Sequence, residues 1–431
     1  MSSLTSSFQT PNILIIKPIK HRTVTIIGAG PAGAVAAALL KRKGHEVLIL
    51  ERQQFPRFSI GESLLAHCLE FIEEAGMLPA VQAAGFQIKN GAAFGWGDRY
   101  TWFDFRDKFS PGPGTTFQVQ RAHFDQIMAN EAMKQGVEVR YRQEVISADF
   151  SNSNPILTVR DLANSNIIYQ VQSEYVLDAS GYGRVLARLL DLESPSSFPP
   201  RKAIFTHIED RIDDIQFDRE KILISIHPQE RGIWYWVIPF SSGRSSVGVV
   251  GKSALIAPLE EGSLATLRRL VDEAPNLKRI LHNAVWDTPA STMSGYSANV
   301  TRLHGPGYAL LGNAAEFLDP IFSSGITIAL RSAKLAAEAL HRQLSGETVN
   351  WETDFSQPLQ VGVETFRAYV EGWYSGEFQD LVFYEKAQPG IRRMISSILA
   401  GYAWDTTNPF VAEPRRRLRT LSELCRQSPQ R

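Results

Sequence analysis

Six residues near the start of the chain have the types and the spacing that bind a pyrophosphate. Residues 28–33 read Gly-Ala-Gly-Pro-Ala-Gly and fit the pattern GxGxxG, and an acid, Glu51, follows them. In such a turn Gly28 makes the tight bend, Gly30 lets a pyrophosphate approach the backbone, and Gly33 lets helix and strand pack closely. Glu51 would accept hydrogen bonds from the ribose diol of an adenosine half. These residues predict a dinucleotide-binding site.

A strand–helix–strand unit would hold these residues in place. Residues 23–27 are β-branched throughout, which predicts a strand buried on both faces. Residues 34–43 predict an Ala-rich helix that Gly44 ends, and residues 46–50 predict the next parallel strand, with Glu51 at its tip. The phosphates would then lie at a helix N-terminus. The alternative is a plain βαβ unit, but strand, turn, helix, strand and acid together favour the dinucleotide site.

Length and composition describe an ordinary globular chain. The 431 residues leave room for two or three compact units, and 45 Lys plus Arg balance 45 Asp plus Glu, so nothing indicates a nucleic-acid partner. Two cysteines, Cys68 and Cys425, form no disulfide framework and no metal cluster, so we expect a reducing cytoplasm and no metal site. No apolar run reaches the length of about 18 residues that a transmembrane helix needs.

Turn signals and strand patterns indicate an α/β fold in four parts. A Rossmann-like domain is interrupted by a meander of strands that would cover a substrate, and a helical, aromatic region follows. Within the first part of the Rossmann-like domain, the spacing of apolar residues over 61–72 predicts an amphipathic helix that begins at Gly61. The parts we expect are a flexible tail (1–21), the nucleotide-binding domain (22–90, 115–200 and 286–345), an antiparallel-sheet substrate domain (91–114 and 201–285) and the helical C-terminal region (346–431).

Three segments far apart in the sequence resemble the FAD-dependent aromatic hydroxylases, reductases and halogenases. They are residues 23–51, 178–181 and 312–325, and the resemblance covers nearly the whole chain. It implies that FAD lies across all three segments and that Arg121 contacts it. Where the family has an aspartate that holds the ribityl chain, this sequence has Asn313, whose amide also donates and accepts hydrogen bonds. The resemblance assigns to FAD Gly28, Gly30, Gly33, Glu51, Arg121, Asp178, Gly312, Asn313, Asp319, Pro320 and Gly325.

Two further motifs are similar to signatures of the flavin-dependent halogenases. Residues 234–239 fit WxWxIP and residues 317–325 fit FxxPxxSxG, while Lys89 follows a Gly-Glu-Ser segment as the family's active-site lysine does. The resemblance implies that reduced FAD, supplied by a separate flavin reductase, reacts with O2 to a C4a-hydroperoxide. A halide would then be oxidised to hypohalous acid, which Lys89 would direct at an electron-rich ring.

Three other parts of the site follow from these motifs. Backbone N–H groups of Ser324 and Gly325, at the expected start of a helix, are suited to bind the halide. Trp234 and Trp236 lie two apart on a strand and share a face, and the resemblance places them on the flavin side; a plain aromatic core is the alternative. For Lys89 the alternative is a solvated lysine on a strand. The residues we expect to be catalytic are Lys89, Trp234, Trp236 and Ser324.

One departure from the family pattern bears on the substrate. Phe322 stands where tryptophan-specific halogenases have a glutamate, so the sequence is closer to halogenases of phenols and pyrroles, whose intermediates lose a proton with less help. The substrate would be free or tethered to an acyl carrier protein, for which the Arg-rich residues 415–419 are a candidate contact. Two alternatives stay open. One is a monooxygenase or dehydrogenase of an aromatic or polyene intermediate, and the other is a flavin-binding protein without turnover.

Overall fold

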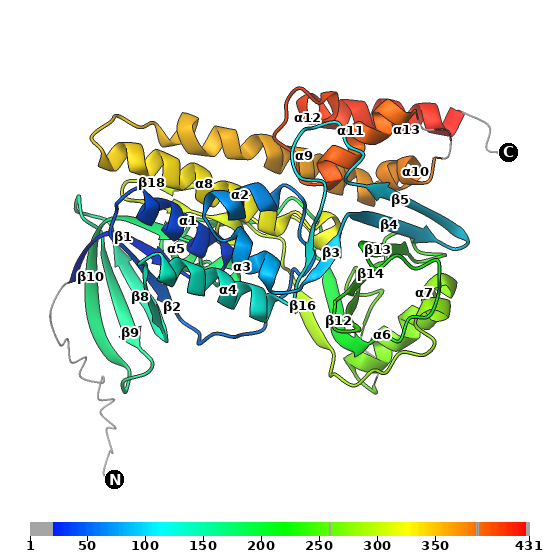
Figure 1. Cartoon of the computed structure of the whole chain (residues 1–431), viewed down its shortest axis with the longest axis horizontal. Coiled ribbons are helices and arrows are strands. Elements are labelled where there is room, and N and C mark those ends of the chain that lie inside the picture. Colours follow the sequence, from blue (N-terminus) through cyan, green and yellow to red (C-terminus); the bar gives the residue numbers. More distant parts are fainter. Residues whose placement is uncertain (1–19, 258–259, 385, 387, 428–431) are drawn as a thin grey trace, which may run out of the picture.

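The structure is a computed structural model that describes residues 20–257, 260–384, 386 and 388–427. Most of the tail expected over residues 1–21 lies outside the described residues. Two sheets stand side by side, and long helices run along one side of both (Figure 1). The predicted α/β fold with a helical C-terminal region is confirmed.

The first sheet places the GxGxxG turn at the end of a central strand. Its order is β18-β19-β10-β1-β2-β7, and the pairs from β19 to β7 are parallel, while β8 and β9 continue it beside β10. Parallel strands all end at the same edge, so the turn after β1 and the acid at the end of β2 meet there. The strands are β1 (Lys20–Ile27), β2 (Val47–Glu51), β7 (Glu138–Tyr141), β8 (Gln143–Asp149), β9 (Ile156–Asp161), β10 (Ile167–Asp178), β18 (His304–Gly305) and β19 (Tyr308–Leu310).

Helices cover one face of this sheet because alternate side chains of β1 point to opposite sides. Val24 and Ile26 belong to a large core that they share with the helices, whereas Ile27 packs with Leu48 and Leu50 in a second core on the other face. Each of these residues is at most 4% exposed. Among the helices that contribute to the large core are α1 (Pro31–Arg42), α2 (Cys68–Glu74), α3 (Leu78–Ala83), α4 (Arg121–Lys134) and α8 (Gly325–Leu344), and the short α5 (Val185–Leu189) lies with the second core.

The second sheet carries the WxWxIP motif on β14. Trp234 and Trp236 face the large core, while Tyr235 and Val237 face a separate core under α6 (Ser263–Asp272) and α7 (Pro275–Ile280). All neighbouring pairs are antiparallel, as expected, except β13 and β4, which are parallel because they come from distant stretches that no hairpin joins. In sheet order the strands are β16 (Ser291–Ser294), β12 (Lys202–Glu209), β15 (Arg244–Gly251), β14 (Trp234–Pro239), β13 (Lys221–Ile226), β4 (Gly91–Trp96) and β5 (Arg99–Asp104).

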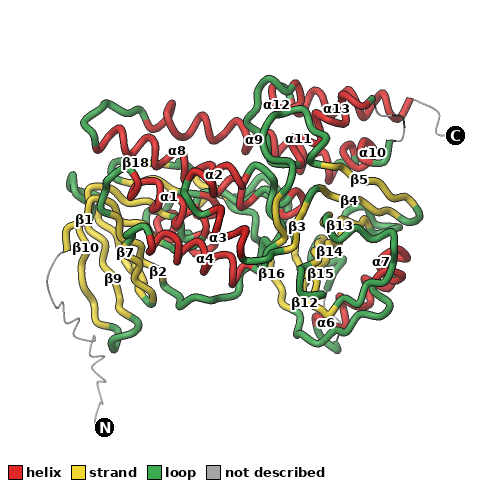
Figure 2. Tube along the Cα trace, in the orientation of Figure 1, coloured by secondary structure: helices red, strands yellow, loops and turns green. Residues whose placement is uncertain are grey.

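The C-terminal helices form one layer with α8 (Figure 2). Their aromatic side chains point inward: Tyr369, Trp373 and Phe378 are fully buried and belong to the large core. No described helix combines the length and the apolar character that crossing a membrane requires. The helices after α8 are α9 (Gln357–Tyr374), α10 (Glu377–Val382), α11 (Pro389–Leu399), α12 (Pro409–Ala412) and α13 (Pro414–Gln427).

The helix expected to begin at Gly61 begins only at Cys68. Around Ser63 the chain instead pairs with β6 (Thr116–Gln118), which itself pairs with β3 (Gln87–Lys89). The N–H of Val119 donates to the carbonyl of Glu62 (2.7 Å), and the N–H of Leu64 donates to the carbonyl of Phe117 (3.1 Å). These long-range bonds replace the helical ones, so tertiary pairing overrides the local amphipathic pattern.

Candidate active site

The three segments expected to hold FAD line one cavity, which we call the cofactor cavity. Its volume is about 350 Å³, which lies within the usual range of roughly 300–1,000 Å³ for ligand sites. The second segment enters as a loop around Gly181–Gly183, and the third enters where α8 begins. Its lining includes Gly28, Gly30, Pro31, Glu51, Arg57, Arg121, Ala179, Ser180, Gly181, Tyr182, Asn313 and Gly325.

The glycine turn is shaped to receive a group against its backbone. Gly28 has a φ of 99°, and a Cβ there would come within 2.6 Å of the Ala179 carbonyl oxygen. A Cβ on Gly33 would collide with the carbonyl of Gly28, so both glycines are required by packing. A Cβ on Gly30 would meet only Arg57, at 3.6 Å, and would otherwise occupy open cavity. The space at Gly30 therefore fits a pyrophosphate.

Glu51 has acceptor capacity left for a ribose. It is 7% exposed, and its two carboxylate oxygens accept the backbone N–H groups of Ala29 and Gln53, each at 2.8 Å. A carboxylate offers about four lone-pair directions, so two stay free toward the cavity. The backbone bonds fix the orientation of the carboxylate, as recognition of a diol requires.

Asp178 and Asp319 shape the site from behind and lie outside the lining of the cofactor cavity. The Asp178 carboxylate accepts the N–H groups of Ser180 (2.9 Å) and Leu186 (2.7 Å), so it holds the loop of the second segment, and burial raises its pKa. Asp319 accepts the hydroxyl of Tyr374 at 2.9 Å, and burial raises the pKa of this carboxyl to about 6.

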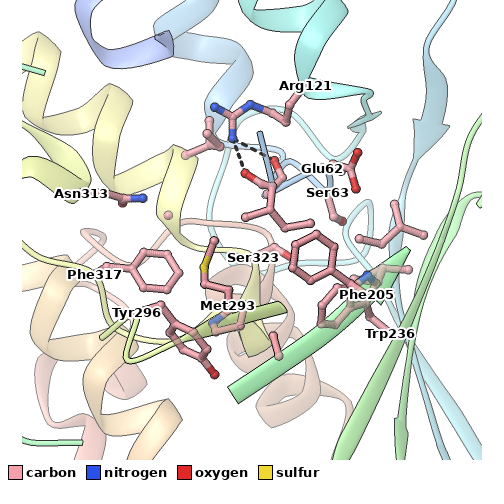
Figure 3. Close-up of a pocket in the computed structure, with 18 of the residues that line it drawn as sticks. Glu62, Ser63, Arg121, Phe205, Trp236, Met293, Tyr296, Asn313, Phe317 and Ser323 are labelled. Atoms are coloured by element: carbon pink, nitrogen blue, oxygen red, sulfur yellow. Dashed lines mark hydrogen bonds between the residues drawn. The ribbon is translucent and has the colours of Figure 1, made fainter. Parts of the chain in front are cut away.

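A second cavity of about 90 Å³, which we call the aromatic cavity, lies where the cofactor cavity meets the second sheet. The two cavities share Arg121, Asn313 and Gly325 in their walls. Arg121 lies in both walls, and its Nη1 donates to the carbonyl of Ile60 (2.8 Å) (Figure 3). Its Nε donates to Asp125 (2.7 Å), which lies outside both linings. The other walls include Gly61, Glu62, Ser63, Phe205, Trp234, Trp236, Tyr296, Phe317, Pro320 and Ser323.

Trp234 and Trp236 form one aromatic wall of this cavity. Their ring centroids are 5.9 Å apart. The indole N–H of Trp234 donates to the hydroxyl of Tyr374 (3.0 Å), and that of Trp236 donates to Ser246 (3.1 Å). With both donors satisfied by protein, the rings offer only apolar surface to the cavity.

The structure places Lys89 outside the lining of both cavities. The side chain is 1% exposed, and Nζ donates to the carbonyl of Leu64 at 2.8 Å and lies 5.3 Å from the Phe105 ring centroid. Leu64 follows Ser63, which does line the aromatic cavity, so the amino group lies behind that wall. Burial lowers the pKa of Lys89 to about 7.

The serine that reaches the aromatic cavity is Ser323, while Ser324 is 2% exposed and lies outside both linings. Ser323 has a φ of 54°, which turns the chain into α8. The motif itself signalled this residue, because Ser323 is the serine of FxxPxxSxG. Gly325, at the start of α8, lines both cavities.

Sequence reasoning placed Glu62 at the end of a connector, residues 53–62, that separates flavin from substrate, but it named none of the side chains of Glu62, Ser63 and Tyr296 as site residues. Each lines the aromatic cavity, and each has a buried side-chain oxygen without a hydrogen-bond partner among the described residues: Oε2 of Glu62, Oγ of Ser63 and the hydroxyl of Tyr296. The Gly-Glu-Ser segment was a visible signal, but its helical interpretation concealed which side chains face the cavity.

Comparison with known proteins decides the family. Residues 21–355 match the family described as FAD binding domain. The chain is 27% identical over 396 residues to the 1H-pyrrole-2-carbonyl-[peptidyl-carrier protein] brominase of Pseudoalteromonas luteoviolacea, covering 90% of this chain and 93% of the relative. It is 31% identical over 345 residues to the tryptophan 2-halogenase of Chondromyces crocatus, covering 79% of this chain and 65% of that relative's length. The chain belongs to the flavin-dependent halogenase family.

Solved structures of two other flavin-dependent proteins superpose on this chain. A flavoprotein/dehydrogenase from Cytophaga hutchinsonii superposes with a TM-score of 0.91 at 40% identity, covering 94% of this chain and 99% of that one. The flavin-dependent brominase Bmp2 superposes with a TM-score of 0.81 at 26% identity, covering 95% of this chain and 100% of that one. The predicted family and its FAD cofactor are thereby confirmed, and the residues of the cofactor cavity fit FAD.

Proposed function

We propose that this flavin-dependent halogenase relative halogenates an electron-rich aromatic ring, phenolic or pyrrolic, with reduced FAD, O2 and a halide. The observation that carries the proposal is the aromatic cavity, which both halogenase motifs line and which shares its wall with the cofactor cavity. When bound, FAD supplies the activation of O2. The residues of this chain then exclude water, hold the halide and orient the ring.

The size of the aromatic cavity argues against a substrate with more than one ring. Its volume of about 90 Å³ is below the roughly 150 Å³ of an engineered cavity in another protein that accepts benzene. Phe322 packs against Tyr369 and Phe378, so the position of the glutamate of tryptophan-specific relatives offers only a buried ring here. Phenols and pyrroles need less help from a base at that place.

The halide would lie against the start of α8. This helix spans 20 residues, so its N-terminus carries the full partial positive charge of an aligned helix. Gly325 faces both cavities there, and the backbone at Ser324 precedes it. An anion held by these N–H groups would lie where the cofactor cavity and the aromatic cavity share a wall.

Lys89 would act from behind the wall formed by Ser63. A pKa of about 7 leaves much of the amine neutral at neutral pH. The ammonium form can donate a hydrogen bond to hypohalous acid, and the neutral form can capture the halogen covalently. Either role requires the hypohalous acid to pass the segment at Ser63 and Leu64.

A second candidate function is a flavin-dependent dehydrogenase or monooxygenase that needs no halide. Two observations favour it. The relative that superposes with a TM-score of 0.91 is described as a flavoprotein/dehydrogenase, and Lys89 is bonded to a backbone carbonyl outside both cavities.

Two partners belong to the proposal, an acyl carrier protein and a separate flavin reductase, both in the cytoplasm. The pyrrole relatives are described as acting on a carrier-bound pyrrole, which supports a tethered substrate. The Arg-rich stretch supports docking less, because Arg415 pairs with Glu371 (2.7 Å) and Arg416 with Glu413 (3.1 Å). Much of its charge is therefore neutralised within the chain.

The first experiment follows the reoxidation of FAD on the protein by absorbance. The chain is loaded with reduced FAD and mixed with oxygenated buffer, with and without bromide, and the products of added phloroglucinol are analysed by mass spectrometry. We expect bromide to change the reoxidation rate with saturation and brominated phloroglucinol to form. Reoxidation indifferent to bromide, with no brominated product, would favour the dehydrogenase or monooxygenase.

A further inference from the structure

We propose that Glu62, held by His207, accepts the hydrogen bond of the substrate's ring O–H or N–H and takes that proton during the reaction. The inference deepens the proposed function and rests on it. Glu62 thereby selects rings that carry an acidic donor. None of the halogenase motifs accounts for such a selection.

The first observation is that half of a buried carboxylate is unused. Glu62 is 1% exposed, and its Oε1 is 2.8 Å from Nε2 of His207. Its Oε2 is buried without a partner among the described residues. A buried carboxylate oxygen left unpaired is costly, and a donor supplied by a ligand in the adjoining cavity would remove that cost.

The second observation is that neighbouring groups suit one polar end of a ring. Ser63 also lines the cavity, and its hydroxyl is buried without a partner in the described part of the chain. Glu62 and Ser63 lie together on one side of the close-up, near Phe205 and Trp236, and Tyr296 lies on the other side (Figure 3). The ring of a substrate would contact the aromatic wall while its donor points to Glu62.

The third observation is that Glu62 is held rigidly from two directions. Its carbonyl accepts the N–H of Val119 (2.7 Å), and Ser63 bridges to Gln118, so the backbone belongs to a small sheet. His207 comes from β12, two residues after Phe205, and therefore shares the face of that strand that meets the cavity. A carboxylate fixed in this way discriminates between donors by geometry.

His207 also offers the proton a way out. Its side chain is 21% exposed, whereas that of Glu62 is 1% exposed. A proton taken from the ring by Oε2 can leave as His207 exchanges a proton with Glu62 on one side and with water on the other. The cavity itself can stay closed to water.

The reaction balances with this residue as base. Glu62 takes the O–H or N–H proton, and the electron-rich ring carbon attacks the halogen of hypohalous acid, so that a C–X bond forms and the O–X bond breaks. The oxygen leaves as hydroxide and becomes water by taking up the C–H proton of the attacked ring carbon. Loss of the ring C–H proton restores aromaticity.

The test compares Glu62→Gln with the unchanged protein, both loaded with oxidised FAD. Two matched pairs of probes are titrated and followed by flavin absorbance: phloroglucinol with 1,3,5-trimethoxybenzene, and pyrrole with N-methylpyrrole. Glutamine keeps the shape and a bond to His207 but loses the charge. We expect one donor probe at least to bind about tenfold more weakly to the variant, while its methylated partner is unaffected.

Glu273→Gln is the matched control. Glu273 lies 3.3 Å from another histidine, His227, which directly follows β13, and it lines neither cavity. This variant should bind all four probes as the unchanged protein does. Equal binding of donor and methylated probes to the unchanged protein, or equal loss of both in Glu62→Gln, would overturn the proposal.

Two further readouts separate this inference from the proposed function. FAD occupancy should be the same in Glu62→Gln, and bromide should still change the reoxidation of reduced FAD. A variant that loses FAD instead would show that the free oxygen serves the cofactor. Bromide-insensitive reoxidation of the unchanged protein would reject halogenation while the binding result still decides the role of Glu62.

Discussion

Lys89 shows how burial changes the chemistry of a single residue. The amino group is surrounded by protein and donates to one backbone carbonyl, that of Leu64. Because the charged form is desolvated, the pKa falls from 10.5 to about 7. The same burial that would prepare the amine for hypohalous acid also makes the charged form unfavourable in the folded protein.

We therefore predict that Lys89→Met changes how stability depends on pH. The pKa is about 7 in the folded protein and 10.5 when unperturbed, so the unfolded chain binds more protons between these values and wild-type stability rises with pH there. The variant should gain most in melting temperature below pH 7 and lose this advantage toward pH 10, measured by thermal unfolding across the series.

Lys134→Met is the control for this prediction, because the Lys134 side chain is 70% exposed. It should follow the wild-type profile at every pH. A stability difference for Lys89→Met that stays constant between pH 6 and pH 10 would show that Lys89 is charged at neutral pH in the folded protein.

At the scale of elements, the end of α9 is bonded to the wall of the aromatic cavity. The hydroxyl of Tyr374 accepts the indole N–H of Trp234 (3.0 Å) and donates to Asp319 (2.9 Å), and the guanidinium of Arg201 lies 3.3 Å from the tyrosine ring centroid. The C-terminal helices thus connect the WxWxIP strand to the FxxPxxSxG motif. They position both motifs without entering the cavity.

Tyr374→Phe should destabilise the protein by about 1–3 kcal/mol, because it removes the partner of two buried polar groups. Both the Trp234 N–H and an oxygen of Asp319 would lose the bond that the hydroxyl provides. Denaturant unfolding measures the effect, with Tyr100→Phe as control since Tyr100 is 46% exposed. Unchanged unfolding would mean that water replaces the hydroxyl.

At the scale of the whole molecule, the cofactor cavity joins parts of the chain that are remote in sequence. The turn after β1, the loop after β10 and the start of α8 meet there. The aromatic cavity, which shares part of its wall with the cofactor cavity, is also lined by the second sheet. A ligand that contacts all of these stabilises the folded state by mass action, since the unfolded chain offers no such site.

FAD should raise the free energy of unfolding by about 2.7 kcal/mol at a free concentration of 100 times its Kd. Thermal shift against FAD concentration measures this. Gly30→Val should abolish the shift and the yellow colour, because its side chain would occupy the space at the glycine turn. Gly390→Val is the control, since a Cβ at Gly390 meets nothing within 4 Å. A yellow Gly30→Val protein with a full shift would move the pyrophosphate elsewhere.

Local patterns in the sequence were enough to predict the fold class, the family and the cofactor. The conformation of the turn at residues 28–33 depends on its neighbours along the chain, a β-branched strand and an Ala-rich helix. The same is true of the long helix α8, which follows the motif of residues 317–325. The structure assembles both beside the cofactor cavity. The helix expected at Gly61 failed because β6, from a distant stretch, takes its backbone hydrogen bonds.

Only the tertiary structure decided what surrounds each functional side chain. The bond between Glu62 and His207 joins residues 145 positions apart, and no spacing rule in the sequence relates them. Likewise Lys89 was visible as a lysine on a strand, but its burial behind Leu64 depends on how β3 and β6 pack. Propensity and periodicity act over a few residues, whereas burial and partner choice depend on contacts made across the fold.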